Sequence, residues 1–155
     1  MTTTASIPPI TKSVVVECPA DVAFMVYTER LNEWWPLGTH SVFEHAASTV
    51  VWELREGGEV YELSAEGERA DWADVRVWDP PHRFVIAWRV NPNDPAATEV
   101  DVRFTAEAAG RTRVDMEHRR WELLGDQAGA DKRAGYNQGW DPVLAEFVAF
   151  ANSLA

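Results

Sequence analysis

The sequence predicts an α+β domain in which a seven-stranded antiparallel sheet wraps around one long C-terminal helix, with two short helices after the first strand. Two observations lead to this fold class. An apolar stripe with the three- and four-residue spacing of a helix runs through residues 129–154. Before it, residues 48–121 read as short strands that alternate with turns. Such a meander buries one face, and the stripe of the last helix can lie on that face.

The C-terminal helix is recognised by the residues that share one side of its helical wheel. With Tyr136 as the origin, that side carries Trp140, Val143, Leu144, Phe147, Phe150, Ala151 and Leu154. Pro142 falls on the polar side, and a proline inside a helix removes a hydrogen bond and bends or breaks the helix. We therefore expect either a kink near residues 139–142 or a helix that begins at Asp141.

Residues 10–155 are expected to form a single domain, and residues 1–9 a flexible segment before it. Residues 10–18 alternate as a first strand. This strand ends at Cys18, the single cysteine of the chain, which excludes an internal disulfide. We interpret Cys18 as a small core residue, with a reactive thiol as the alternative.

Two short helices and an irregular segment are expected after the first strand. Pro19 and Asp21 are typical of a helix start. A second short helix is expected over residues 30–35, because Pro36 restricts the residue before it. Residues 37–45 show no period and are interpreted as a lid or a pocket wall.

Six further strands follow with short connections. They are expected at residues 50–55, 59–65, 69–78, 83–90, 98–105 and 112–121. In the fifth of these, Val102 and Phe104 alternate with charged residues, which is typical of a strand with one buried face. The alternation also suggests that Glu62 lies with other glutamates on the outer face, and that Trp72 and Arg76 share that face. A cation–π contact between Arg76 and a tryptophan would then be exposed.

The composition argues against several classes of partner. Of the 155 residues, 46% are hydrophobic and 25% are charged, which is ordinary for a globular domain. The net charge of −11 argues against nucleic acid or an anionic membrane surface as a partner, because both need clustered Lys and Arg. No signal peptide or apolar run of membrane-spanning length is recognised, so a cytoplasmic location is expected.

Eight tryptophans are an unusual number for one domain. Buried indole N–H groups need partners, so such a surplus indicates thick aromatic packing, a ring-lined cavity, or both. A curved sheet around a helix leaves room between them, and we expect a pocket there. The residues expected to line it are Trp34, Trp35, Phe43, Trp88, Val102, Phe104, Met116, His118, Tyr136, Trp140, Leu144 and Phe147. The alternative is that these rings simply fill the core.

His118 is a polar side chain expected on the inner face of the sheet, because it is in phase with the apolar residues of its strand. A histidine there could serve as acid or base near neutral pH, which makes it the one catalytic candidate. The alternative is a core histidine bonded to the backbone or to a tyrosine. His40, His45 and His82 fall in loops and are interpreted as surface groups, and no spacing supports a metal site.

Several segments resemble one known family. They are Gly57-Gly58, Trp78-Asp79-Pro80-Pro81 running into residues 83–88, residues 99–105, residues 112–118, and Gly139-Trp140 in the last helix. With the order of elements, they resemble the family called activator of Hsp90 ATPase homologue 1-like (AHSA1-like), of the START-like or SRPBCC superfamily, over residues 10–151. The resemblance implies the helix-grip (START/Bet v 1-like) fold with a hydrophobic cavity between sheet and helix.

The same resemblance implies a range of functions. Relatives bind lipids, sterols, polyketides or plant hormones, and some are aromatase/cyclases or hydroxylase subunits. The family takes its name from a eukaryotic co-chaperone. No separate chaperone-binding domain is found in this sequence, so the co-chaperone activity is not transferred.

Three functions follow as hypotheses. The first is binding of a small hydrophobic molecule, lipid-like or an aromatic polyketide, between the sheet and the last helix. The second is an enzyme of the cyclase or dehydratase type that uses the same pocket with His118 as acid or base. The third is a protein-interaction subunit linked to a chaperone or regulator, for which a homodimer is one arrangement. No cofactor is expected, because no cofactor or metal motif is recognised.

Overall fold

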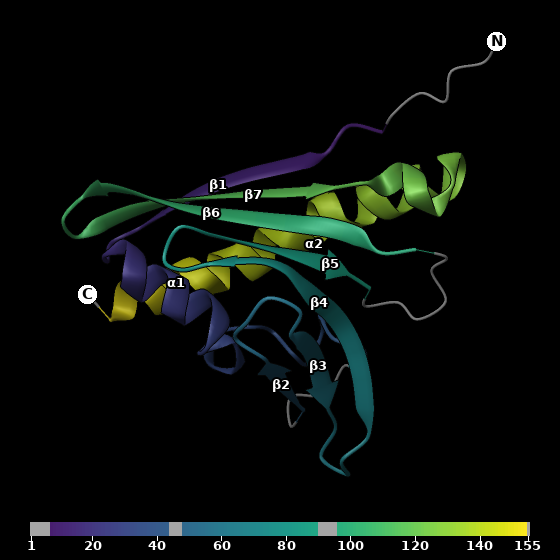
Figure 1. The fold of residues 1–155 in the computed structure, drawn as a ribbon, viewed down its shortest axis with the longest axis horizontal. Helices are drawn as coiled ribbons and strands as arrows, with labels where there is room; N and C mark the ends of the chain where they lie inside the picture. The colour runs from purple at the N-terminus through teal and green to yellow at the C-terminus, as the bar shows by residue number, and fades with distance from the viewer. Residues whose placement is uncertain (1–6, 44–47, 90–95, 155) are drawn as a thin grey trace.

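The protein, described by a computed structural model over residues 7–43, 48–89 and 96–154, forms one seven-stranded antiparallel sheet (Figure 1). The strands are β1 (Ile10–Val16), β2 (Thr49–Trp52), β3 (Glu59–Leu63), β4 (Arg69–Asp79), β5 (Arg83–Trp88), β6 (Thr98–Ala108) and β7 (Arg111–Arg119). Their order is β1-β7-β6-β5-β4-β3-β2. Every neighbouring pair except β1 with β7 is consecutive in sequence, so the predicted meander is confirmed.

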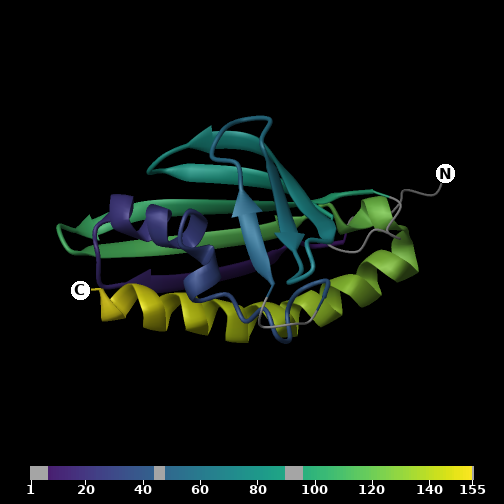
Figure 2. The same ribbon diagram turned by 90° about the horizontal axis from the view of Figure 1, so that it is seen from below.

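The helices also follow the predicted order. α1 (Ala20–Thr28) and the 3-10 helix η1 (Leu31–Glu33) come directly after β1. The long helix α2 (Asp126–Ser153) lies across one face of the sheet (Figure 2). This arrangement confirms the helix-grip fold. Of the predicted flexible N-terminal segment, residues 1–6 lie outside the described residues.

Helix α2 runs without a break through Pro142. It begins at Asp126, one residue after the 3-10 helix η2 (Trp121–Leu124), so the alternative that the helix begins at Asp141 is wrong. Pro142 is exposed, whereas the next residue, Val143, is buried. Figure 2 shows the helix as a gentle curve along the sheet. The predicted stripe is buried from Trp140 to Ala151, apart from the half-buried Phe150, whereas Leu154 at its end is 41% exposed.

One end of the space between sheet and helix is filled by aromatic rings. Phe24 and Tyr27 of α1 contact Phe104 at centroid distances of 5.1 and 6.2 Å. Tyr27 also packs on Trp34 and on Phe147 of α2, at 5.2 and 5.1 Å. Helix α1 therefore closes this end of the interface with solid packing.

Two residues predicted on the outer face of the sheet are buried instead. Trp72 is 1% exposed, because the β4 register shifts against both β3 and β5 and each bulge changes which side chains face inward. Glu62 is 0% exposed, because it is in phase with the buried Val60 on β3. Arg76 stays outside, where it pairs with Asp74 at 2.6 Å instead of stacking on a tryptophan.

Candidate functional site

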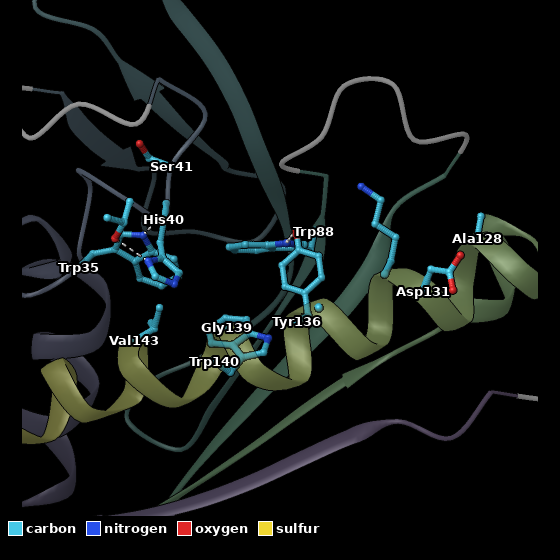
Figure 3. Close-up of a pocket in the computed structure, with 13 residues that line it drawn as sticks. Trp35, His40, Ser41, Trp88, Ala128, Asp131, Tyr136, Gly139, Trp140 and Val143 are labelled. Atoms are coloured by element: carbon cyan, nitrogen blue, oxygen red, sulfur yellow. Dashed lines mark hydrogen bonds between the residues drawn. The ribbon is translucent and has the colours of Figure 1, made fainter.

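A cavity of about 700 Å³ lies between the sheet, helix α2 and the segment that follows η1. Its lining consists of Trp35, Thr39, His40, Ser41, Trp88, Ala128, Asp131, Lys132, Gly135, Tyr136, Gly139, Trp140 and Val143. Figure 3 shows that these residues come from the segment after η1, from the end of β5 and from one side of α2. A cavity of this size can hold a small organic molecule.

Three indole rings form the inner wall of the cavity. Trp140 of α2 lies 5.7 Å from Trp88 and 5.9 Å from Trp35, centroid to centroid. Tyr136 extends the wall along α2, and its Oη accepts a hydrogen bond from Trp88 Nε1 at 3.0 Å. Each indole is at most 7% exposed, so packing fixes its orientation while part of the ring faces the cavity. Such fixed rings are suited to contact a flat apolar molecule.

Gly135 and Gly139 lie about one turn apart on the α2 side of the cavity. A Cβ atom at either position would meet no atom within 4 Å. Glycine inside a helix costs roughly 0.5–1 kcal/mol relative to alanine, so helix stability does not explain the pair. Their effect is to leave the cavity wide where it meets the helix.

His118 lies behind the aromatic wall and is completely buried. Its Nδ1 accepts a hydrogen bond from Trp140 Nε1 at 3.0 Å, and its Nε2 bonds to Thr98 Oγ1 at 2.7 Å. Because an indole nitrogen can only donate, Nδ1 carries no proton and the neutral ring holds its proton on Nε2. The ring also stacks on Trp121 at a centroid distance of 4.1 Å.

These contacts make His118 a positioning residue. Both of its ring nitrogens bond to protein groups, and it does not line the cavity. Burial lowers its pKa to about 3, because the charged ring would lose its hydration. The hypothesis that His118 acts as acid or base on a ligand is therefore not supported by its geometry. Its contribution is to hold Trp140 in place.

We expect the protein to lose stability as the pH falls below about 6.5, because of His118. The unfolded chain takes up a proton there near pH 6.5, whereas the folded ring does so only near its pKa of about 3. Protons therefore favour unfolding between these values, by roughly 1.4 kcal/mol per pH unit. Urea unfolding between about pH 6.5 and 4.5 measures the slope. His118→Gln should flatten it, and an unchanged slope in that variant would contradict the assignment.

Four of the twelve residues predicted to line a pocket line this cavity: Trp35, Trp88, Tyr136 and Trp140. Seven others lie in the core outside the lining: Trp34, Val102, Phe104, Met116, His118, Leu144 and Phe147. Phe43 is half-buried, beyond the lining residues 39–41. The spacing of hydrophobic residues identifies which face of a helix or strand is buried. It does not show where along that face a cavity remains between the packed side chains.

Several lining residues were missed by the sequence prediction. His40 was interpreted as a surface group, whereas it lies in the cavity wall. Asp131 and Lys132 add charge to the lining, and Figure 3 shows Asp131 near the start of α2. The signal that could have found this wall is the pair Gly135 and Gly139, because two glycines four residues apart beside an apolar stripe weaken a helix unless the space is used.

Glu62 holds in place the segment that contains residues 39–41, by hydrogen bonds to its backbone. Its carboxylate accepts hydrogen bonds from the backbone N–H groups of Val42 and Phe43 at 2.8 and 3.3 Å. It also accepts one from Trp72 Nε1 at 3.0 Å. A buried carboxylate is stable when it receives several N–H donors, and here the donors come from the end of a cavity wall.

Within the described part of the chain, no group of three His, Cys, Asp or Glu side chains could hold a metal ion. No helix among the described residues is both long enough and apolar enough to cross a membrane.

Comparison with known proteins gives one family. The family model described as "Activator of Hsp90 ATPase homolog 1-like protein" matches residues 17–152. A search of curated proteins finds no matching sequence.

Three solved structures are similar to this chain over nearly its full length. Anthrahydroquino-gamma-pyrone synthase Txn09, complexed with a compound abbreviated SUM, is 33% identical, with 93% of this chain and 97% of that chain covered and a TM-score of 0.65. CalC from Micromonospora echinospora, a self-sacrificing resistance protein, is 29% identical, with 96% of each chain covered and a TM-score of 0.71. The Aha1 dimer from Colwellia psychrerythraea is 16% identical, with coverages of 94% and 97% and a TM-score of 0.67, which supports the fold alone.

Proposed function

The chain belongs to the activator of Hsp90 ATPase homolog 1-like family, and from this premise we propose that it binds a small, flat, largely apolar molecule in the cavity between the sheet and α2. The observation that carries the proposal is the wall of Trp35, Trp88 and Trp140 around about 700 Å³ of space. The preferred ligand class is a fused-ring aromatic compound of the polyketide type.

The aromatic wall favours a flat ligand over a flexible chain. A contact between two aromatic rings adds about 0.5–1.5 kcal/mol beyond the area that it buries. The indoles are held by hydrogen bonds from Trp140 to His118 and from Trp88 to Tyr136, so a ligand need not order them on binding. A rigid ring system gains most from such a wall, because it loses little conformational entropy itself.

The comparison with Txn09 supports the same ligand class. That protein is named as a synthase of an anthrahydroquino-gamma-pyrone, which is a fused-ring aromatic compound, and it is 33% identical over nearly the whole chain. The name also favours a second candidate function, an enzyme that acts on such a compound. A reaction would need a proton-transfer group in the cavity wall; the predicted candidate His118 does not lie there, whereas His40 does.

The proposal is tested by binding of 1,2-dihydroxyanthraquinone to the wild-type protein, measured by calorimetry and by quenching of tryptophan fluorescence. We expect a Kd on the order of 10 µM and strong quenching, because three indoles meet the ligand. Tetradecanoate, which is apolar but not flat, serves as the comparison and is expected to bind at least about tenfold more weakly. Equal or tighter binding of tetradecanoate would overturn the ligand class, and failure of both to bind would overturn the binding function.

A further inference from the structure

His40 is the histidine that lies in the wall of the cavity. Its imidazole is on the cavity side of the segment after η1, opposite Val143 of α2 (Figure 3). Its backbone is fixed, because Trp35 Nε1 donates to the His40 carbonyl at 2.6 Å. The residue thus belongs to the same rigid frame as the aromatic wall.

The contacts of His40 allow a tautomer in which Nε2 is free to accept a proton. Its Nδ1 lies 2.7 Å from Thr39 Oγ1, and this hydroxyl donates its own proton toward the Pro36 carbonyl at 3.4 Å. When this hydroxyl donates to the Pro36 carbonyl, Thr39 Oγ1 can only accept from His40, and in that arrangement Nδ1 of the neutral ring carries the proton. It follows that Nε2 presents a lone pair.

In this arrangement His40 and His118 have opposite tautomers. In His118 the lone pair is on Nδ1 and is used by Trp140, whereas in His40 the lone pair is on Nε2 and has no protein partner among the described residues. Because His40 lines the cavity and His118 does not, the basic nitrogen open to a ligand is that of His40.

We propose that Nε2 of His40 is the proton acceptor of the cavity, for a phenolic or enolic hydroxyl on a flat aromatic ligand. The inference rests on the proposed function. In the transfer, the ligand O–H bond breaks, its electron pair stays on oxygen, and the proton forms a bond to Nε2. The resulting imidazolium donates from Nδ1 to Thr39 and from Nε2 to the oxyanion, which stabilises the ion pair in a site of low polarity.

Besides His40, the lining contains two side chains that carry charge. These are Asp131 and Lys132. In Figure 3, Asp131 lies nearer the start of α2, away from His40. The residues of α2 that face the His40 side of the cavity, Gly139 and Val143, carry no charge.

The tautomer is tested without any ligand. Long-range ¹H–¹⁵N correlation spectra at neutral pH should show His40 with its proton on Nδ1 and His118 with its proton on Nε2. Thr39→Val should move His40 toward a mixture of tautomers. A wild-type His40 that holds its proton on Nε2 would overturn the inference.

The proton transfer is tested with 1,2-dihydroxyanthraquinone, whose visible absorption changes when its hydroxyl ionises. Bound to the wild type at neutral pH, it should show at least about tenfold more anion than when bound to His40→Gln. His82→Gln, which removes an exposed histidine outside the cavity, is the matched control and should behave as the wild type. Binding to both proteins with equal ionisation would overturn the inference and leave the proposed function standing. No binding to any of them would overturn both.

Discussion

Replacing Glu62 with alanine is expected to lower the free energy of unfolding by about 3–5 kcal/mol and to weaken ligand binding. The change leaves three donors without their acceptor: the half-buried N–H groups of Val42 and Phe43 and the buried Nε1 of Trp72. Two of these donors end the segment that forms one cavity wall, and the third belongs to a ring that packs on Trp35 at 5.2 Å. Stability and binding should therefore fall together. Urea unfolding and calorimetry with 1,2-dihydroxyanthraquinone measure both.

Two variants make the result specific to the carboxylate. Glu62→Gln keeps one oxygen acceptor but turns the other oxygen into a donor that faces an N–H group, so an intermediate loss of about 1–3 kcal/mol is expected. Glu66→Ala removes an exposed glutamate from the turn after the same strand and should change stability by less than about 0.5 kcal/mol. If Glu62→Ala unfolds at the same urea concentration as Glu66→Ala, the carboxylate does not fasten the wall.

Gly139→Leu is expected to abolish ligand binding while the fold stays as stable as before. The new side chain would occupy cavity space, since a Cβ at Gly139 meets no atom within 4 Å. Leucine is favoured over glycine in a helix by nearly 1 kcal/mol, so the free energy of unfolding should hold or rise. The affinity for 1,2-dihydroxyanthraquinone should fall at least about a hundredfold.

The matched control for this variant lies on the same helix. Ala145 is exposed and is not part of the lining, so Ala145→Leu adds a similar side chain outside the cavity. It should bind the probe as the wild type does. Unchanged binding by Gly139→Leu, in a protein that remains folded, would show that the probe does not use this cavity.

The fold could be predicted because its elements carry strong periodic patterns. The stripe of α2 and the alternation of β6 each follow one rule over many residues, and the structure agrees with both. The effect of Pro142 is harder to predict, because two tendencies compete. Proline removes a helix hydrogen bond, whereas burial of Trp140 before it and Val143 after it stabilises a continuous helix. Trp72 was misplaced because a bulge adds a residue to one strand, and periodicity does not show where a bulge lies.

The site could be predicted only in part, and Trp34 and Trp35 show why. They are neighbours in sequence at the end of a 3-10 helix, and both are nearly buried. The Trp34 indole donates to the Val26 carbonyl and packs among the rings near α1, whereas the Trp35 indole donates to the His40 carbonyl and faces the cavity. Val26 and His40 do not share a helix or strand with the two tryptophans, so no regular spacing connects them. The sequence pattern therefore cannot show which ring faces the cavity.

The most direct test of the central claim is a crystal structure of the protein with 1,2-dihydroxyanthraquinone bound. The account predicts the fused rings in van der Waals contact with Trp88 and Trp140, beside Gly139 of α2. A ligand bound on the outer face of the sheet, with none in the cavity beside Trp140, would contradict the account.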